Sequence, residues 1–445
     1  MKTIKPFAIA AAALMMSFAS CNKDNTGNGK IDEGNPTYMG ISFTISATGA
    51  ATRADANATE AETAFKFVDV FIYNKATGTQ ATHARISAND FTGPTGGTGS
   101  DDWTLKAAAK IATTTGEKAV IVGVNLSSDL SASLVGASMG EFINIAQSVI
   151  VDDVTGATDG FAMFSTEVKN VTLIKDPDFN ARENYPTVQV QRLVAKVTVQ
   201  KDENINIIAN GTLDNLMFEL NNTNKKTFYI QPADKKDHNW ETTPAGDLNA
   251  LNNIYVAVNE YDATVRDLNA KYALENTTRD FLMGQVTRAT IRGTFVPALV
   301  KEFFNDTDNS EGYKDVDVTS TVPATFYSVI YNMGANRAYF FDEAVANDFA
   351  DDNNATAVTY TDGLCYWDMF LNPDNNPDGL PDMGGPFDVL RNDFYRCNII
   401  KIVAPGRATP EVTDPNQPPT QETDLMVDIQ MLYWKPIMKD YTLEP

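Results

Sequence analysis

The sequence predicts an all-β protein, built of antiparallel β-sandwiches with a few short helices. Short runs in which apolar and polar residues alternate recur along the whole chain, and this period of two is typical of half-buried strands. Clusters of Gly, Asn, Asp and Pro separate the runs, as turns between antiparallel strands do. Hydrophobic residues make up 43% of the 445 residues, enough for roughly two or three domains with cores of their own.

The first alternating run covers residues 38–49 and places Met39, Ile41, Phe43 and Ile45 on one face of a strand. Because one face is apolar and the other polar, this strand is expected to be half-buried. Further runs of the same kind occupy residues 65–74, 118–127, 187–200, 252–261, 285–296, 324–333, 397–406 and 424–434.

Helical patterns are few, and the best short candidates are residues 101–112 and 139–150. The segment around residue 188 is rich in Pro, Asn and Asp, which indicates a crossing between two domains. We therefore expect an N-terminal sandwich over residues 54–188 and a C-terminal sandwich over residues 189–445.

Charge and composition restrict the function. The chain has 35 Lys and Arg against 58 Asp and Glu, a net charge of −23, which argues against a nucleic-acid partner and against docking on anionic membranes. His83 and His238 are the only histidines, so a His-rich metal site is excluded. No P-loop, dinucleotide-binding glycine motif or nucleophile elbow is present. We expect a protein that is not an enzyme and needs no cofactor.

Residues 1–20 have the pattern of a secretory signal. Lys2 and Lys5 precede an apolar run that is too short to span a membrane comfortably. The run ends in small residues directly before Cys21, as in bacterial lipoprotein signals, in which this cysteine becomes the lipidated N-terminus. The alternative is an ordinary secretory signal followed by an unrelated cysteine. Both interpretations predict export.

Several motifs follow one another in a characteristic order. The stretch "TRAD" precedes an acidic spacer and "VDVFIYN", then come "VQRLVAKVTV" and the late cluster "GLCYWDMF" to "RNDFYRCNIIKIVAPGRATP". With the start at Cys21 and the ending "LMVDIQMLYWKPIMKDYTLEP", this order resembles the fimbrial major subunits of Bacteroidales, the FimA-like type V pilins. The likeness extends over nearly the whole chain.

The resemblance implies two transthyretin-like β-sandwich domains and a precursor that is lipid-anchored at the outer membrane before it joins a cell-surface fimbrium. It also implies that an extracellular Arg-specific protease removes a segment with a β-strand, and that the C-terminal strand of a neighbour fills the vacated groove. The implied partners are identical or related subunits in a head-to-tail filament, the protease, and a host or bacterial surface ligand.

Arg53 is the residue at which the protease is expected to cut. It stands alone in a small polar stretch directly after the first predicted strand, and proteases require such extended, accessible chain. Cleavage would remove residues 21–53, including Cys21, and would leave Ala54 as the new N-terminus. The alternatives are a surface cation in a loop and a cut at Arg85.

The donor strand is expected in residues 436–445, with Ile437, Tyr441 and Leu443 entering the groove. Pro436 cannot donate a hydrogen bond to a ladder, so it marks a break or an edge position. The alternative is an ordinary last strand of the C-terminal sandwich.

One segment has the spacing of the front half of a calcium loop. Oxygen-bearing side chains occupy its first, third, fifth and ninth places, and Gly379 occupies the sixth. These side chains belong to Asp374, Asn376, Asp378 and Asp382. The twelfth place holds Gly385 instead of a bidentate acid, and strings of Asn, Asp, Pro and Gly are also ordinary turns.

The two cysteines that follow Cys21, Cys365 and Cys397, could form a disulfide in an exported protein. The sequence alone does not place their Cα atoms within bridging distance.

Two other functions stay open at this point. The subunit could be the tip adhesin of a fimbria instead of its stalk. It could also be a glycan-binding surface lipoprotein that never polymerises, in which Trp103, Trp240 and Trp367 would form sugar platforms. The simpler interpretation of these tryptophans is core or loop packing.

Overall fold

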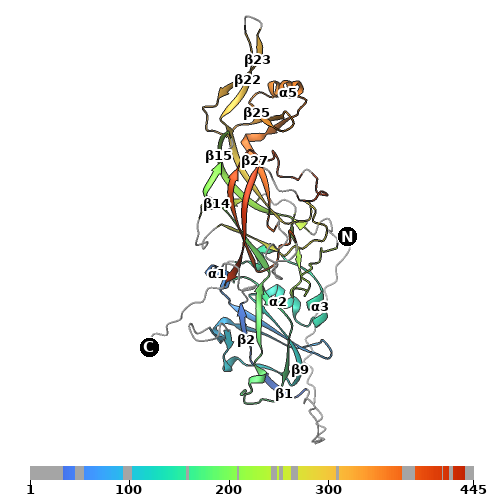
Figure 1. Cartoon of the computed structure of the whole chain (residues 1–445). Helices are drawn as coiled ribbons and strands as arrows, with labels where there is room; N and C mark the ends of the chain where they lie inside the picture. Colours follow the sequence, from blue (N-terminus) through green and yellow to red (C-terminus); the bar gives the residue numbers. More distant parts are fainter. Residues whose placement is uncertain are drawn as a thin grey trace, which may run out of the picture.

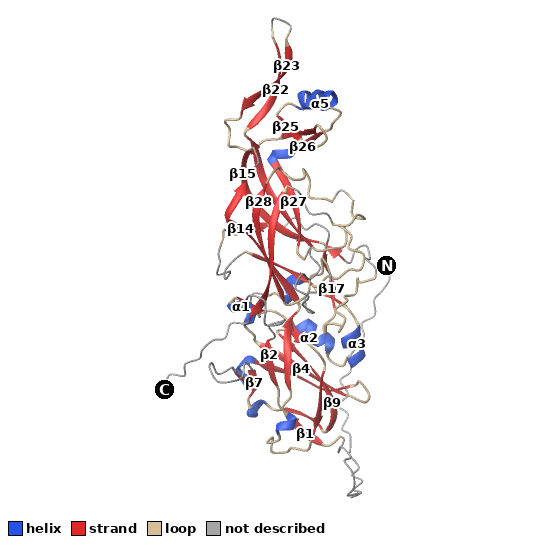
Figure 2. Cartoon of the chain, in the orientation of Figure 1, coloured by secondary structure: helices blue, strands red, loops and turns tan. Residues whose placement is uncertain are grey.

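The fold is taken from a computed structural model. The structure describes residues 34–45, 55–93, 103–156, 160–207, 210–241, 248–249, 254–261, 269–306, 310–372, 386–412, 414–419 and 424–435. The molecule is elongated, with an N-terminal sheet at one end, two facing C-terminal sheets in the middle, and a small subdomain with a protruding hairpin and one helix at the other end (Figure 1). Strands dominate the described residues and the helices are short (Figure 2), which confirms the predicted all-β class.

The N-terminal sheet has nine strands, in the order β5-β4-β9-β11-β13-β2-β7-β6 with β12 paired to β9. Its strands are β2 (Ser42–Ile45), β4 (Phe67–Asn74), β5 (Gln80–Ser87), β6 (Phe91–Thr92), β7 (Trp103–Leu105), β9 (Gly116–Val124), β11 (Met163–Ser165), β12 (Lys169–Leu173) and β13 (Thr187–Arg192). A separate pair joins β1 (Pro36–Met39) to β8 (Ile111–Thr114). Both faces of β4 and β9 are buried, which explains their nearly continuous apolar sequences.

Two sheets face each other in the C-terminal part. One has the order β20-β14-β28-β29-β3 and the other β19-β15-β21-β27. Their strands are β20 (Ala270–Leu274), β14 (Val194–Ile207), β28 (Asp393–Ile402), β29 (Leu425–Lys435), β3 (Asp55–Asn57), β19 (Val256–Ala257), β15 (Gly211–Asn221), β21 (Arg288–Pro297) and β27 (Leu364–Phe370). Val197 and Ile399 from the first sheet share a core with Phe218, Ile291 and Trp367 from the second.

A small subdomain is inserted between β21 and β27. It contains the hairpin β22 (Leu299–Asn305) and β23 (Glu311–Asp317), the three-stranded sheet of β25 (Asn336–Phe340), β24 (Phe326–Tyr331) and β26 (Ala357–Tyr360), and helix α5 (Glu343–Asp352). Asp342 caps α5 by accepting a hydrogen bond from the Val345 amide at 3.1 Å. Phe349 of the helix packs against Val329 and Phe340 of the sheet.

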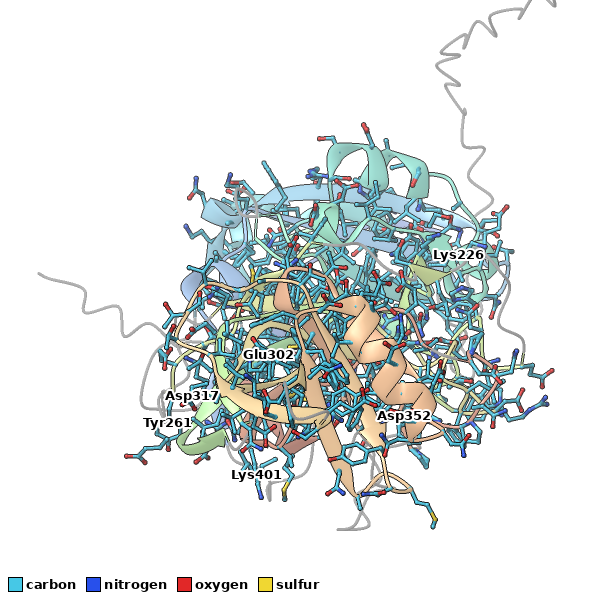
Figure 3. All side chains as sticks on the ribbon, turned by 90° about the horizontal axis from the view of Figure 1, so that it is seen from above. Lys226, Tyr261, Glu302, Asp317, Asp352 and Lys401 are labelled. Carbon is cyan, nitrogen blue, oxygen red and sulfur yellow. The ribbon has the colours of Figure 1, made fainter. Side chains whose placement is uncertain are left out.

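Figure 3 looks down on this distal end. Glu302, Asp317 and Asp352 are exposed there, and so are Phe303 and Met333. The distal end therefore carries part of the acidic surface that the net charge of −23 requires.

Short elements fill the connections. They are α1 (Glu60–Thr63), α2 (Ser128–Leu134), α3 (Met139–Asn144), α4 (Val151–Val154), β10 (Gln147–Ser148), β16 (Thr223–Asn224), β17 (Lys226–Thr227), β18 (Leu248–Asn249) and the 3₁₀ turns Ala88–Asp90, Ala107–Ala109, Arg182–Asn184 and Thr361–Gly363. Among the described residues, no helix combines the length and the apolar character that crossing a membrane requires.

The two helix predictions have different outcomes. The segment 139–150 begins with α3, where Ser138 and Glu141 form a capping box, so its first half is confirmed. The helix predicted over residues 101–112 is wrong, because this stretch forms β7, a 3₁₀ turn and the start of β8. Its alanines favour a helix locally, but the pairing of β7 with β2 and of β8 with β1 overrides that preference.

The sheet membership of the strands changes at Leu193, because β13 ends at Arg192 and β14 begins at Val194. This point lies a few residues after the break expected near residue 188. Most pairs are antiparallel, as predicted, but β2–β13, β14–β28 and β3–β29 are parallel.

Candidate functional site

The strand predicted before Arg53 is an interior member of the N-terminal sheet. β2 lies between β13, to which it is parallel, and β7, to which it is antiparallel. The side chains of Met39, Ile41, Phe43 and Ile45 are 0%, 0%, 0% and 7% exposed, so the predicted burial is confirmed. The single strand predicted here is wrong, because the run forms two strands, β1 and β2, in different sheets. We call the place that residues 36–45 occupy the seat.

Hydrogen bonds hold β2 on both sides. The Ser42 amide donates to the Pro186 carbonyl at 3.0 Å, and the Leu105 amide donates to the Ile41 carbonyl at 2.9 Å. The hydroxyls of Ser42 and Thr104 lie 3.1 Å apart. Without β2, the facing edges of β13 and β7 would lose these backbone partners, and unpaired edges are templates for another strand.

The pocket for Phe43 is made of aromatic rings from residues that follow Arg53. The Phe43 ring meets Phe65 edge-on at 5.3 Å and Phe91 at 5.5 Å between centroids. Phe65 in turn meets Trp103 at 4.7 Å. An apolar side chain in this position therefore gains both burial and edge-to-face ring contacts.

The chain changes from one sheet to another inside the seat. β1 pairs with β8, β2 pairs with β13 and β7, and Gly40 lies at the crossing. The Gly40 amide donates to the Asn184 carbonyl at 2.9 Å. The fully buried Asn184 side chain donates to the Tyr38 carbonyl at 2.9 Å and to the Ile174 carbonyl at 3.0 Å. The Tyr38 carbonyl of β1 is thus satisfied by a side chain of the same domain.

The two described residues that flank the predicted cut lie in different sheets. Ile45 ends β2 in the N-terminal sheet, and Asp55 begins β3, which runs parallel to the end of β29. Arg53 and Ala54 themselves lie outside the described residues, and so does Cys21. Cleavage and lipidation stay predictions.

A buried cluster joins β29 to the helix that follows β3. The Trp434 indole Nε1 donates to Glu62 Oε2 at 3.0 Å. Lys196 Nζ lies 2.7 Å from Glu62 Oε1, and the Tyr272 hydroxyl donates to the same oxygen at 2.8 Å. Burial disfavours the Glu62 carboxylate, but the Lys196 charge and hydrogen bonds from Lys196, the Thr59 amide and Tyr272 hold its pKa below the usual value.

Arg192 completes this cluster, which we call the junction. Its guanidinium lies 4.3 Å from the centroid of the Trp434 ring and donates to the Trp434 carbonyl at 3.2 Å. It also donates to the Glu62 carbonyl at 2.9 Å and to Asn392 Oδ1 at 3.0 Å. Burial lowers the pKa of Arg192 to about 10. The last described strand is therefore fixed to the N-terminal domain one residue before it ends at Lys435.

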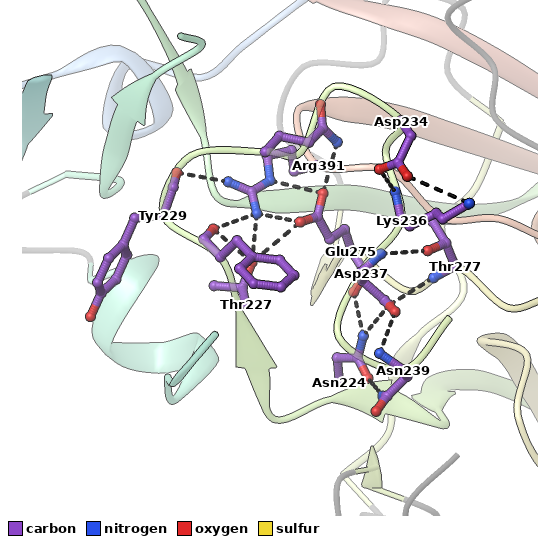
Figure 4. Close-up of polar contacts among 12 residues, drawn as sticks. Asn224, Thr227, Tyr229, Asp234, Lys236, Asp237, Asn239, Glu275, Thr277 and Arg391 are labelled. Carbon is purple, nitrogen blue, oxygen red and sulfur yellow. Dashed lines mark hydrogen bonds and ion pairs between the residues drawn. The ribbon is translucent and has the colours of Figure 1, made fainter. Parts of the chain in front are cut away.

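A second polar network braces the two domains (Figure 4). Arg391 is paired with Glu275 and donates to the Tyr229 carbonyl at 3.0 Å and to Thr227 Oγ1 at 2.6 Å. These bonds hold the end of β17 and the loop that follows it, whose Tyr229 ring stacks on Phe164 of the N-terminal core at 4.8 Å. A loop of the C-terminal part thus enters the core of the N-terminal part.

Asp237 lies in the same network. Its carboxylate accepts hydrogen bonds from the Thr277 amide at 2.8 Å, the Asn239 amide at 2.7 Å and Asn224 Nδ2 at 2.7 Å. Burial raises the pKa of Asp237 to about 7 in spite of these donors. Sequence reasoning did not find the junction or this network, because buried charged residues look like surface residues in a sequence.

The other predicted residues are placed as follows. Ile437, Tyr441 and Leu443 of the donor segment lie outside the described residues, and so do Asp374, Asn376, Asp378 and Asp382. In the part of the chain that the structure describes, no group of His, Cys, Asp and Glu side chains could hold a metal ion. The donor strand and the calcium loop stay predictions.

The disulfide between Cys365 and Cys397 is not formed. Both thiols are buried and free, and burial raises their pKa values. Cys365 belongs to β27 and Cys397 to β28, in two sheets that face each other. Facing sheets are about 10 Å apart, and a disulfide needs a shorter Cα separation.

The three tryptophans do not share one surface. Trp367 is fully buried and donates to the Ala404 carbonyl at 3.2 Å. Trp103 and Trp240 are partly buried, and the Trp103 ring packs on Phe65 beside the seat. Trp367 is thus core, which weakens the case for a tryptophan-lined sugar platform.

Comparison with known proteins identifies the C-terminal part. Residues 358–440 match the family model of the major fimbrial subunit protein type IV, fimbrillin, C-terminal. The C-terminal part of the chain is therefore similar to the fimbrillin family, and the resemblance seen in the sequence is confirmed. No curated relative matches the chain at a significant level.

Solved structures are similar to this chain over most of its length. A candidate cell adhesion protein from Parabacteroides distasonis ATCC 8503 has a TM-score of 0.50 at 16% identity, with 92% of this chain and 99% of that chain covered. A fimbrilin from Porphyromonas gingivalis W83 has a TM-score of 0.48 at 14% identity, with 90% and 98% covered. At this identity the first likeness establishes the fold.

Proposed function

We propose that this protein is a structural subunit of a cell-surface fimbria and mediates adhesion. The fimbrillin match over residues 358–440 and the fold shared with a candidate cell adhesion protein support this role. In the proposed pathway, the precursor is exported as a lipoprotein anchored at the outer membrane through Cys21. An extracellular Arg-specific protease then cuts after Arg53, and Ala54 becomes the new N-terminus.

The observation that supports this proposal best is the position of β2. It is an interior strand of the N-terminal sheet, yet it precedes Arg53 in sequence. Cleavage after Arg53 would leave residues 34–45 bound only by non-covalent contacts. Their departure would expose the sites of four apolar side chains and unpair the facing edges of β8, β13 and β7, which is unfavourable in water.

A strand from another subunit would restore both the burial and the backbone hydrogen bonds. Residues 436–445 are the proposed donor, with Ile437, Tyr441 and Leu443 as the side chains that enter the pockets. They follow β29 directly, whose end is fixed at the junction. Each subunit would then fill the seat of an identical or related neighbour, and such a head-to-tail contact generates a filament.

Protease treatment of the purified full chain tests the proposal. We expect an Arg-specific protease to produce a chain that begins at Ala54, together with a ladder of oligomers. The Arg53→Lys variant keeps the charge but removes the recognised side chain, so it should stay a monomer. A wild-type chain that begins at Ala54 but stays monomeric would contradict polymerisation. A tip adhesin would instead join a growing fibre once and end it.

A further inference from the structure

Gly40 lies against a tyrosine ring at the crossing between the two halves of the seat. A Cβ atom on Gly40 would lie 2.1 Å from Tyr185 Cε1 and 2.4 Å from its Cζ. Real side chains do not approach this closely, so only a glycine fits while the ring keeps its place. The ring therefore covers the backbone where β1 gives way to β2.

Several contacts hold Tyr185 in this position. Its ring packs against Phe179 at 4.8 Å between centroids, and its amide donates to the Arg182 carbonyl at 3.0 Å. Its neighbours in sequence are anchored to the seat, because the Asn184 carbonyl accepts from Gly40 and the Pro186 carbonyl accepts from Ser42. A ring between two such residues is restricted in how far it can move.

Tyr185 divides the seat into two halves. The first half holds β1 against β8, and the second holds β2 between β13 and β7. A strand that fills both halves must pass under the ring. The strand present in the precursor does so with Gly40, whereas residues 436–445, "PIMKDYTLEP", contain no glycine.

We propose that Tyr185 sets the specificity and register of the incoming strand. A strand occupies the whole seat only if it carries glycine at the crossing. The C-terminal strand of a sister subunit, which has none, occupies the half between β13 and β7 and stops at Tyr185. This inference depends on the proposed function, since it concerns the strand that replaces residues 36–45.

Peptide binding to the cleaved protein tests the role of Tyr185. The full chain is cut after Arg53, and two fluorescent peptides of residues 36–45 are added, the parent peptide and its Gly40→Ala variant. We expect the parent peptide to bind at least tenfold more tightly, a difference of about 1.4 kcal/mol. In the Tyr185→Ala protein the ring is absent, so the two peptides should bind within about twofold of each other.

Three controls separate this inference from the proposed function. A Ser42→Ala peptide loses the hydroxyl contact with Thr104, which is not under the ring, so its binding relative to the parent peptide should be the same in wild type and in Tyr185→Ala. The Tyr327→Ala protein, altered in the distal subdomain, should discriminate like wild type. A peptide of residues 436–445 should bind wild type and Tyr185→Ala equally, because it stops before the ring.

The outcomes are distinct. Equal binding of the parent peptide and the Gly40→Ala peptide to the wild-type protein overturns the role of Tyr185 and leaves the groove intact. Binding of none of the peptides overturns the groove itself. Because the first comparison uses only the wild-type protein, it holds even if Tyr185→Ala does not fold.

Discussion

The seat and the junction hold two strands of this protein by different kinds of contact. In the seat, β2 is bound by apolar side chains and neutral backbone hydrogen bonds, which any strand with a similar alternation can supply. In the junction, Trp434 of β29 is bound by Glu62 and Arg192. Few side chains other than tryptophan could make both of these contacts. The first arrangement suits a strand that is exchanged, and the second suits a strand that stays.

The difference also separates the two ends of the proposed mature chain. Residues 34–45, the described part of the segment before Arg53, pair with β8, β13 and β7 of the N-terminal domain. By contrast, β3, just after Arg53, pairs with β29 at Tyr433–Lys435. One cut would therefore release the strand in the seat and leave the new N-terminus beside the base of the donor segment.

Removal of the donor segment should have the largest effect. A chain that lacks residues 436–445 keeps β29 and the junction, so we expect a folded, cleavable monomer that cannot extend a fibre. It should still accept a strand, and should therefore block growth when it is mixed with cleaved wild-type subunits. Electron microscopy measures the length of the fibres, and gel electrophoresis shows the ladder of oligomers. Normal lengthening of fibres by the truncated chain would refute the proposed donor.

Loss of the junction tryptophan should cost the most stability. Trp434→Ala removes a fully buried ring and leaves Glu62 and Arg192 without their contacts to it, so we expect a loss of about 3–5 kcal/mol in unfolding free energy. Trp434→Phe keeps most of the packing but loses the Nε1 hydrogen bond, at a cost of about 1–3 kcal/mol. Urea unfolding compares them, and a loss below about 1 kcal/mol for the alanine variant would show that the junction does not fix β29.

The sequence predicted the seat far better than the junction. Alternation is a local property, so the buried face of Met39, Ile41, Phe43 and Ile45 could be deduced from the period of two alone. The parallel pairing of β2 with β13 could not, because the two strands are more than a hundred residues apart and adjacent strands in sequence predict antiparallel neighbours.

The junction is invisible in sequence for another reason. Glu62, Arg192 and Lys196 are charged, and charged residues are usually exposed. Only the folded chain shows that, below the surface, Lys196 pairs with the Glu62 carboxylate and Arg192 donates to the Glu62 carbonyl. In the Ala-rich stretch 101–112, by contrast, a clear local pattern predicted the wrong structure. Its preference for helix is overridden by pairing with strands that precede Arg53.

The buried polar network around Asp237 should make the stability of the folded chain depend on pH. Its pKa is raised from 3.8 to about 7 in the folded state, so the folded chain keeps a proton that the unfolded chain releases. The contribution of Asp237 to the free energy of unfolding should therefore be largest below about pH 4. It should fall by at most about 4 kcal/mol as the pH rises to about 7. Urea unfolding at several pH values measures the slope, and Asp237→Asn should flatten it. An unchanged slope in this variant would assign the effect to other groups.

The smallest expected effect is the loss of stability in the Gly40→Ala variant, which depends on whether the seat is occupied by the first strand. Gly40→Ala places a methyl group against the Tyr185 ring, and overpacking of this kind costs about 1–3 kcal/mol. Because residue 40 precedes Arg53, the loss should appear in the uncleaved precursor and vanish once the released segment has left. The cleaved variant and the cleaved wild type are then the same molecule, so each serves as the control for the other. Thermal unfolding before and after cleavage measures both states. A difference that persists after cleavage would mean that the first strand stays in its seat.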